Sequence, residues 1–129
     1  MAVIQRVIFM AFIAATLFHV TTAIAGEATY YTVYVPSACY GFQNQGTMIA
    51  AVNEPLWANG RNCGRSIRVR CTGRTNNGVL QPCRNGEITV RIVDRCPGCH
   101  ANQIDLSQEA FSMIADTNAG RIRTEYNLV

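Results

Sequence analysis

Six cysteines limit the folds open to this chain more than any other feature of its sequence. They follow residues 1–25, which have the parts of a secretory leader: a basic residue at Arg6, an apolar run from Val7 to Val20, and the small-x-small signal Ala23–Ala25. A secreted chain enters an oxidising compartment, where an even number of cysteines forms disulfides. We therefore expect three disulfides, in a pairing that spacing leaves open. The cysteines are Cys39, Cys63, Cys71, Cys83, Cys96 and Cys99.

Removal of the leader leaves enough chain for one domain. Cleavage after Ala25 would leave Gly26–Val129 (129 − 25 = 104 residues), and we expect a single extracellular domain. The run Val7–Val20 is shorter than the about 20 residues that span a bilayer, so no membrane span is expected after cleavage. A net charge of +3 is too small for a nucleic-acid-binding domain, and no nucleic-acid partner is expected. A monomer is the expected state.

Alternation of apolar and polar residues predicts an all-β domain. Apolar side chains alternate with charged or polar ones through 67–71 and 88–92, a period of two that is typical of half-buried strands. Residues 26–35, 47–52 and 121–129 are further predicted strands, rich in β-branched, aromatic or alternating residues. Because these short strands are not all joined by hairpin turns, they favour a small barrel with crossing connections.

One helix is predicted, just after residue 107. Ser107 is a good N-cap, and Leu106 before it is placed to pack on Phe111 as a hydrophobic staple. Four apolar residues then form a single stripe, which is the pattern of a helix packed on a core. The stripe consists of Ala110, Phe111, Ile114 and Ala115.

Two carboxylates are expected at the ends of one stapled loop. The predicted strand closes at Val93, next to Asp94, a Pro-Gly turn follows between Cys96 and Cys99, and Asp105 stands at the predicted helix entry. Paired carboxylates on a rigid loop serve acid–base chemistry on glycans. Acidic residues are equally common at strand ends and helix starts, where their role is structural.

Five motifs follow one another along the chain: 28–31 (ATYY), 37–41 (SACYG), 56–64 (LWANGRNCG), 92–97 (IVDRCP) and 104–107 (IDLS). In this order they resemble the expansin-like family, which is related to family-45 endoglucanases and barwin. Within it the chain is most similar to the plant natriuretic peptide and blight-associated protein group. The resemblance implies a six-stranded double-psi β-barrel with one short α-helix. It also implies the disulfides Cys39–Cys63, Cys71–Cys83 and Cys96–Cys99.

The segment Cys96–His100 formally matches the haem-attachment pattern C-x-x-C-H. A predicted strand precedes it, whereas a redox-active pair needs its first cysteine at a helix N-terminus. The chain carries neither a second C-x-x-C nor an H-x-x-x-H, which a zinc site would need. We expect a structural disulfide here, and neither a cofactor nor a metal.

The resemblance places Tyr30, Tyr31, Asp94 and Asp105 in a glycan groove. Asp105 occupies the general-acid position of the related endoglucanases, and Asp94 the position of a groove-lining aspartate in expansins. The second endoglucanase carboxylate corresponds to Thr32, whose hydroxyl cannot act as a base near neutral pH. We therefore expect no enzymatic activity and no catalytic residue. Only one of two adjacent tyrosines on a strand can face the groove.

Arginines form a second candidate surface around Cys63 and Cys71. Alternation places Arg68 and Arg70 on one face of a strand, and the guanidinium group suits carboxylates, including those of uronic acids or of an acidic receptor surface. An ordinary solvated face has the same pattern. The five candidates are Arg61, Arg65, Arg68, Arg70 and Arg74.

These features predict a secreted, non-catalytic protein of the extracellular space, in the cell wall or apoplast. The resemblance to plant natriuretic peptides implies a systemic role in water and solute homeostasis and stress response, with a cell-surface receptor as partner. Two alternatives stay open. The first is a module that binds acidic or neutral wall polysaccharide, and the second is a weak lytic glycanase.

Overall fold

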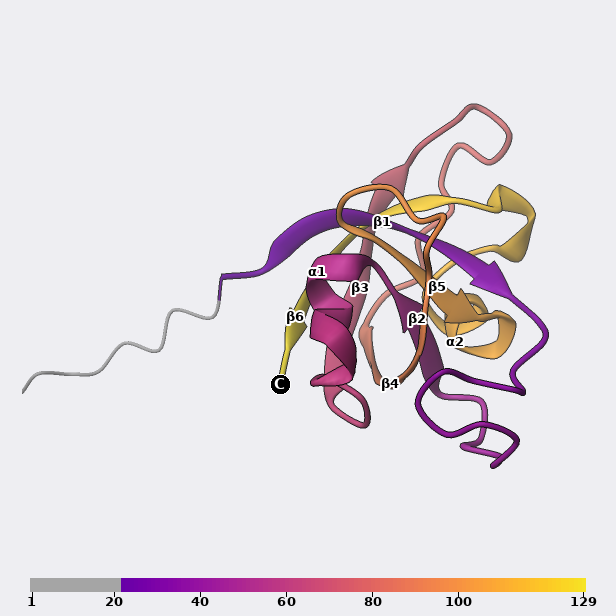
Figure 1. The fold of residues 1–129 in the computed structure, drawn as a ribbon. Coiled ribbons are helices and arrows are strands. Elements are labelled where there is room, and N and C mark those ends of the chain that lie inside the picture. Colours follow the sequence, from indigo (N-terminus) through magenta and orange to yellow (C-terminus); the bar gives the residue numbers. More distant parts are fainter. Residues whose placement is uncertain (1–21) are drawn as a thin grey trace, which may run out of the picture.

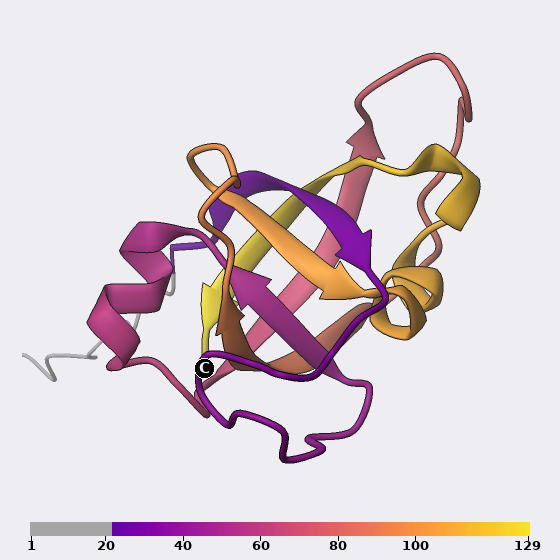
Figure 2. The ribbon, with the colours of Figure 1, turned by 45° about the vertical axis from the view of Figure 1, so that its right-hand side comes forward.

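The computed structural model describes residues 22–129, and most of the predicted leader lies outside this range. The described chain has six strands: β1 (Ile24–Tyr31), β2 (Ile49–Val52), β3 (Ser66–Arg74), β4 (Glu87–Arg95), β5 (Gln103–Ser107) and β6 (Ile122–Leu128). They close into a barrel in the order β1-β5-β2-β4-β3-β6 (Figures 1 and 2). The pairs β1–β5 and β2–β4 are parallel, and the others are antiparallel. This mixed barrel is the fold class that the sequence predicts.

The interior of the barrel is filled by the apolar half of each alternating strand. In β3, Ile67 and Val69 are fully buried while Arg68 and Arg70 are exposed. In β4, Ile88, Val90 and Ile92 are buried with exposed residues between them, and Val93, which follows Ile92 directly, is buried as well. The period-two prediction for these strands is confirmed, and burial of this apolar surface is the main source of stability.

The predicted helix is α2 (Gln108–Ile114). The Ser107 hydroxyl accepts a hydrogen bond from the Ala110 amide at 3.0 Å, as an N-cap does. Phe111 is fully buried, and its ring lies 5.0 Å from that of Tyr30, edge to face. The cap and the apolar stripe that the sequence indicates are both present.

A second α-helix, α1 (Glu54–Trp57), forms where the sequence analysis predicts no helix. Asn53 caps it, because the Asn53 Oδ1 accepts from the Leu56 amide at 3.0 Å, and Pro55 is tolerated in a first turn. Two 3-10 helices, η1 (Ala58–Gly60) and η2 (Thr117–Ala119), are also short. Figure 2 shows α1 and α2 on opposite sides of the barrel. No helix within residues 22–129 has the length and apolar character needed to cross a membrane.

Three boundaries differ from those that the sequence predicts. The strand β1 covers Ile24–Tyr31, whereas the prediction is 26–35, because β1 pairs with β6 from Ile24 and with β5 only as far as Tyr31. Asp94 lies inside β4, and Asp105 lies inside β5 rather than at a helix entry. Both aspartates pair with β2, a long-range ladder that local sequence does not reveal. A helix-entry role for Asp105 is therefore wrong.

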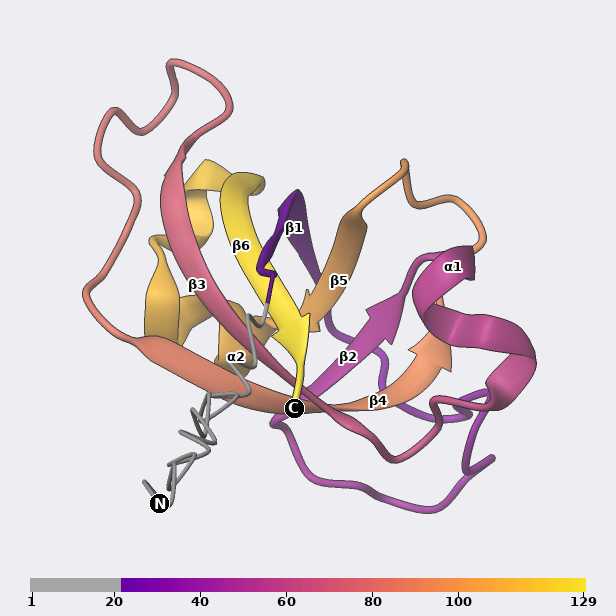
Figure 3. The same ribbon diagram turned by 90° about the vertical axis from the view of Figure 1, so that its left-hand side faces the viewer.

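The disulfides join the cysteines as the resemblance implies. Cys39–Cys63 ties the connection between β1 and β2 to the segment before β3, and Cys71–Cys83 ties β3 to the connection before β4. That connection, residues 75–86, extends away from the barrel (Figure 3). Cys96–Cys99 closes the turn after β4. All six cysteines are paired.

The disulfides should stabilise the fold unequally. Their sequence separations are 24, 12 and 3 residues, and loop-closure entropy gives about 3.5, about 3 and under about 2 kcal/mol respectively. Replacing Cys71 and Cys83 together by Ser should therefore cost more unfolding free energy than replacing Cys96 and Cys99. Guanidinium unfolding of the two double variants measures this. An equal or reversed order would show that native contacts of the Cys96–Cys99 turn dominate.

Candidate functional site

A row of four residues crosses four adjacent strands of the barrel. In the strand register, Thr29 on β1 lies beside Asp105 on β5, Asp105 lies beside Ala51 on β2, and Ala51 lies beside Asp94 on β4. The neighbours of Asp105 on β5, Ile104 and Leu106, are in the core, so alternation turns Asp105 outward. We call Thr29, Asp105, Ala51 and Asp94 the carboxylate row. The barrel thus brings together both aspartates that the sequence singles out.

The separation of the two acids follows from strand spacing. Asp105 and Asp94 are two strands apart, and neighbouring strands lie about 4.8 Å apart, so their backbones are separated by about 10 Å. Ala51, the residue between them, contributes only a methyl group. The spacing is wide enough for a sugar ring, since inverting glycosidases hold water and sugar between carboxyl groups roughly 6.5–9.5 Å apart.

Asp105 is half-buried and is supported by polar neighbours. The Thr29 hydroxyl donates to Asp105 Oδ1 at 2.9 Å, and the Gln103 side-chain amide donates to the Thr29 hydroxyl at 3.0 Å. Burial raises the pKa of Asp105 above its ordinary value of 3.8, while the Thr29 hydrogen bond and the charge of Arg121 act in the opposite direction. Asp105 is thus a carboxyl group that holds its proton more strongly than a solvated one.

Asp94 anchors a loop. Its Oδ1 accepts hydrogen bonds from the backbone amides of Ala38 and Arg95, both at 2.9 Å. The Cys39 amide donates to the Val93 carbonyl at 3.0 Å, so the connection between β1 and β2 is fastened to β4 at two successive residues. Asp94 therefore shapes one wall of the site as well as carrying charge.

The two adjacent tyrosines face opposite sides of β1. Tyr30 packs on Phe111 at the core, whereas Tyr31 lies on the outer face beside the carboxylate row. Burial raises the pKa of the Tyr31 hydroxyl, and the nearby charges of Asp94 and then Asp105 raise it further. This hydroxyl is buried and has no hydrogen-bond partner among the described residues. Of the two tyrosines, Tyr31 alone is placed to meet a ligand of the row.

Thr32 cannot act as the second catalytic carboxylate, and the two acids that could replace it, Glu27 and Glu54, are both in ion pairs. Thr32 follows the last residue of β1 and is exposed. Glu27 forms an ion pair with Arg121 at 2.8 Å, and Glu54 forms one with Arg95. Asp94 is therefore the carboxylate that shares a row with Asp105, and its Oδ1 is occupied by two backbone amides.

The five candidate arginines are spread along β3 and the segment before it, where Arg61 follows η1, rather than gathered in one patch. Arg65 precedes β3 and Arg74 ends it, nine residues on, a span of about 30 Å in extended chain. Arg68 pairs with Glu87 at 3.4 Å, and Arg70 pairs with Glu125 at 2.6 Å. The positive charge of β3's outer face is therefore largely neutralised by acids on its two neighbours.

Three residues of the site have no conspicuous sequence signal. Thr29 and Gln103 support Asp105 by hydrogen bonds, and the charge of Arg121, just before β6, acts to lower the pKa of Asp105. Thr29 lies inside the motif at 28–31, and Gln103 directly precedes the motif at 104–107, so their positions could have indicated a link to the site. Arg121 belongs to no motif and is brought to the site by the register of β6 against β1.

The C-x-x-C-H segment is a disulfide-closed turn with an exposed His100. Within residues 22–129 there is no group of three or more His, Cys, Asp or Glu side chains that could hold a metal ion.

The barrel and its outer carboxylate row define an expansin-like double-psi β-barrel protein. A family model described as "Lytic transglycolase" matches residues 49–126, more than half of the chain. An EG45-like domain containing protein of Citrus jambhiri is 57% identical over 107 residues, covering 81% of each chain. EG45-like domain containing protein 2 of Arabidopsis thaliana is 40% identical over 124 residues, covering 95% of this chain and 94% of that protein. The chain belongs to the EG45-like group of this expansin-like family.

A solved structure shows the same fold in a longer protein. A Clavibacter michiganensis expansin variant, crystallised in complex with cellohexaose, superposes with a TM-score of 0.66 at 26% identity. The match covers 84% of this chain and 50% of that one, so the similarity concerns half of the expansin.

The raised pKa of Asp105 makes a specific pH prediction. Because the folded chain holds this proton more tightly than the unfolded chain, the stabilisation is full below pH 3.8 and is lost as the pH rises from 3.8 to the raised pKa. Carbon-detected NMR titration should place the Asp105 midpoint above 3.8. Thr29→Val should raise it further, because it removes a hydrogen bond that favours the carboxylate. A midpoint at or below 3.8 in the wild-type protein would contradict the dominance of burial.

Proposed function

We propose that the protein is secreted to the cell wall and binds polysaccharide there, without hydrolysing it, through the carboxylate row and Tyr31. The observation that supports this most directly is the Tyr31 hydroxyl, buried and unpartnered beside two carboxylates. Leaving a buried hydroxyl unpaired costs free energy. A ligand hydroxyl that bonded Tyr31 would remove that cost.

The chemistry of the row suits a neutral glycan chain. Sugar hydroxyls donate to carboxylates and accept from a phenol, and Asp94, Asp105 and Tyr31 offer these partners within one row and its neighbour. Tyr34 adds an aromatic ring 5.3 Å from that of Tyr31, edge to face. The cellohexaose complex of the related expansin is consistent with a glycan as the ligand of this fold.

The same geometry argues against hydrolysis. A glycosidase needs one carboxyl group to donate a proton and a second carboxylate to act as base or nucleophile. Asp105 has the raised pKa of an acid, yet Thr32 cannot supply the base, and Glu27 and Glu54 are in ion pairs. We infer a binding site that retains one carboxyl group of a glycosidase pair, that of Asp105, and lacks the other.

A second candidate is an extracellular signalling role in water and solute homeostasis, as expected for a natriuretic-peptide-like protein. It is supported by similarity to EG45-like proteins over nearly their full lengths. Arg61 and Arg65 are exposed, and among the described residues neither forms an ion pair with an acid. Arg74 is likewise exposed and unpaired, but it lies at the far end of β3, whereas Arg61 and Arg65 flank Cys63 and are placed to contact an acidic receptor surface together.

Retention on insoluble wall polysaccharide tests the first proposal. Asp105→Asn and Tyr31→Phe should each weaken retention by about two- to tenfold, the usual effect of losing one hydrogen bond. Tyr30→Phe is the matched control, since it removes a hydroxyl from the adjacent residue on the core side. Tyr31→Phe should not destabilise the fold, because the hydroxyl it removes is unpartnered. Equal retention of all four proteins would refute a role for the row.

The absence of hydrolysis has its own assay. The secreted protein should release no reducing sugar from cellulose, xyloglucan or mixed-linkage glucan above a blank. Release that disappears in Asp105→Asn and Asp94→Asn would mean that Asp94 serves as the base. Thr32→Asp is the converse variant, because it restores a carboxylate where the related endoglucanases have one.

The signalling role predicts a different pattern. Arg61→Gln with Arg65→Gln should reduce a cellular water- or ion-flux response, while Asp105→Asn leaves it intact. Arg68→Gln with Arg70→Gln is the matched control, since these charges are already neutralised by Glu87 and Glu125. Because exposed ion pairs contribute only about 0–1 kcal/mol, each double variant should fold. If Asp105→Asn abolished the response instead, signalling would depend on the carboxylate row.

A further inference from the structure

A continuous chain of hydrogen bonds leads from the C-x-x-C-H turn to Asp105. The His100 backbone amide donates to Gln103 Oε1 at 2.9 Å, and Gln103 Nε2 donates to the Thr29 hydroxyl at 3.0 Å. The Thr29 hydroxyl then donates to Asp105 Oδ1 at 2.9 Å. This chain begins one residue after the Cys96–Cys99 disulfide and ends in the carboxylate row. We call the four residues His100, Gln103, Thr29 and Asp105 the Gln103 relay.

The first member of the Gln103 relay sets the direction of every bond in it. A backbone N–H can only donate, so the Gln103 side chain must turn its oxygen toward His100 and its NH₂ group toward Thr29. The Thr29 hydroxyl therefore accepts from Gln103, and its single hydrogen is left for Asp105. Asp105 Oδ1 is thus held as an acceptor. Asp105 Oδ2 accepts no hydrogen bond from residues 22–129, which leaves it for a ligand.

Gln103 is fixed by its backbone as well as by its side chain. It is 6% exposed, although alternation along β5 places its side chain on the same outer face as Asp105. The Gln103 amide donates to the His100 carbonyl at 3.1 Å, and the Gln103 carbonyl accepts from Asn53 Nδ2 at 3.0 Å. Rotation of the buried side chain would leave its polar atoms without these partners, which costs free energy. The relay therefore has one favoured arrangement.

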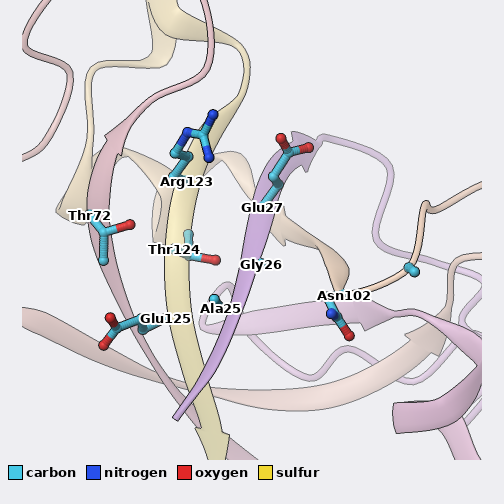
Figure 4. A pocket seen from close by; sticks show the side chains of 9 residues that line it. Ala25, Gly26, Glu27, Thr72, Asn102, Arg123, Thr124 and Glu125 are labelled. Carbon is cyan, nitrogen blue, oxygen red and sulfur yellow. The ribbon is translucent and has the colours of Figure 1, made fainter.

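The turn that carries His100 is attached to the strand that carries Thr29. On β1, the Glu27 amide donates to the Asn102 carbonyl at 3.3 Å. Figure 4, a view of the pocket on this flank of β1, shows Asn102 on the turn that leads into β5 and Glu27 on the neighbouring strand. Because the disulfide closes the start of the turn and β1 holds its end, the His100 amide is positioned relative to Thr29.

No titratable group on the elements around Asp105 takes the place of this relay within residues 22–129. Burial raises the pKa of Asp105, and the Thr29 hydrogen bond, followed by the charge of Arg121, acts to lower it. The strand β2, which pairs with β5, has no titratable residue. The groups on the other elements are Glu27 and Tyr31 on β1, Asp94 on β4, His100 on the turn before β5, Glu109 on α2 and Arg121 before β6.

We propose that Gln103 is a positioning residue of the carboxylate row, which acts through Thr29 to hold Asp105 as the hydrogen-bond acceptor for a hydroxyl of the bound glycan. The inference rests on the proposed polysaccharide-binding function and names a residue on which that function depends. Gln103 is buried and meets no ligand itself, so its effect passes through Thr29. The C-x-x-C-H turn then has a role at the site, since it presents the amide that orients Gln103.

Gln103→Glu reverses the middle of the relay. The new carboxylate still accepts from the His100 amide, but it offers Thr29 an acceptor in place of a donor. The Thr29 hydroxyl is then drawn away from Asp105, and a second negative charge lies nearby. Both effects raise the Asp105 midpoint, by about one pH unit or more in a carbon-detected NMR titration. Gln108→Glu is the matched control, because it adds the same charge at an exposed residue of α2 and should move the midpoint by under about 0.3 pH unit.

Gln103→Met removes the relay without adding charge. The Thr29 hydroxyl loses the donor that orients it, so the Asp105 midpoint should rise by about 0.3–1 pH unit. In a Thr29→Val background the same substitution should leave the midpoint unchanged, because the effect passes through Thr29. An unfolding free energy that falls while the midpoint stays in place would show that Gln103 only holds the turn, and would overturn the proposal. If Gln103→Met does not fold, Gln103→Glu, which keeps the bond to His100, decides the question.

The pH dependence of retention on neutral glucan connects the relay to binding. Retention should fall as the pH drops through the Asp105 midpoint, because a carboxylate is the stronger acceptor. In Gln103→Glu and Gln103→Met this fall should move to higher pH by the same interval as the midpoint. A midpoint that moves while the retention profile does not would overturn the positioning role. Wild-type protein that is not retained at any pH would refute the proposed function instead, and the NMR titration would still decide whether Gln103 acts on Asp105.

Discussion

Closure of the barrel is the constraint on which every site in this protein depends. The strand β1 pairs in parallel with β5 and antiparallel with β6, and these two ladders complete the ring. Since side chains alternate with a period of two, the register decides which residues share a row on the outside. A slip of one residue in β5 would turn Asp105 into the apolar interior and bring Leu106 to the surface. The apolar core therefore also positions the carboxylate row.

The two aspartates of the carboxylate row have different roles. One carboxylate oxygen of Asp94 accepts hydrogen bonds from two backbone amides, and this holds the loop between β1 and β2 against β4. Asp105 is supported by Thr29 and is buried enough to raise its pKa. Hydrolysis needs two carboxyl groups of opposed protonation state and free access. A row with one acid and one structural anchor is better suited to holding a glycan than to cleaving it.

Alternation on β1 also explains which of its residues adjoin the carboxylate row. Glu27, Thr29 and Tyr31 share its outer face, so residues two apart lead from the Glu27–Arg121 ion pair to the carboxylate row. Arg121 links Glu27 to this row electrostatically, because it pairs with Glu27 and its charge also partly offsets the rise in the pKa of Asp105. The exposed arginines of β3 contribute less net charge than their number suggests, since the barrel places an acid beside two of them.

Much of the fold was readable in the sequence, because its signals are local. Period-two alternation marked the strands around Val69 and Val90, the Ser107 cap marked α2, and motif resemblance supplied the barrel class and the disulfides. The helix after Asn53 was missed, since a single capped turn hardly differs from a loop in sequence. Only the tertiary structure decided that Asp105 belongs to a strand and that Tyr31, rather than Tyr30, faces outward. Strand register and burial depend on contacts between segments far apart in the chain, so they cannot be predicted from the residues of one segment alone.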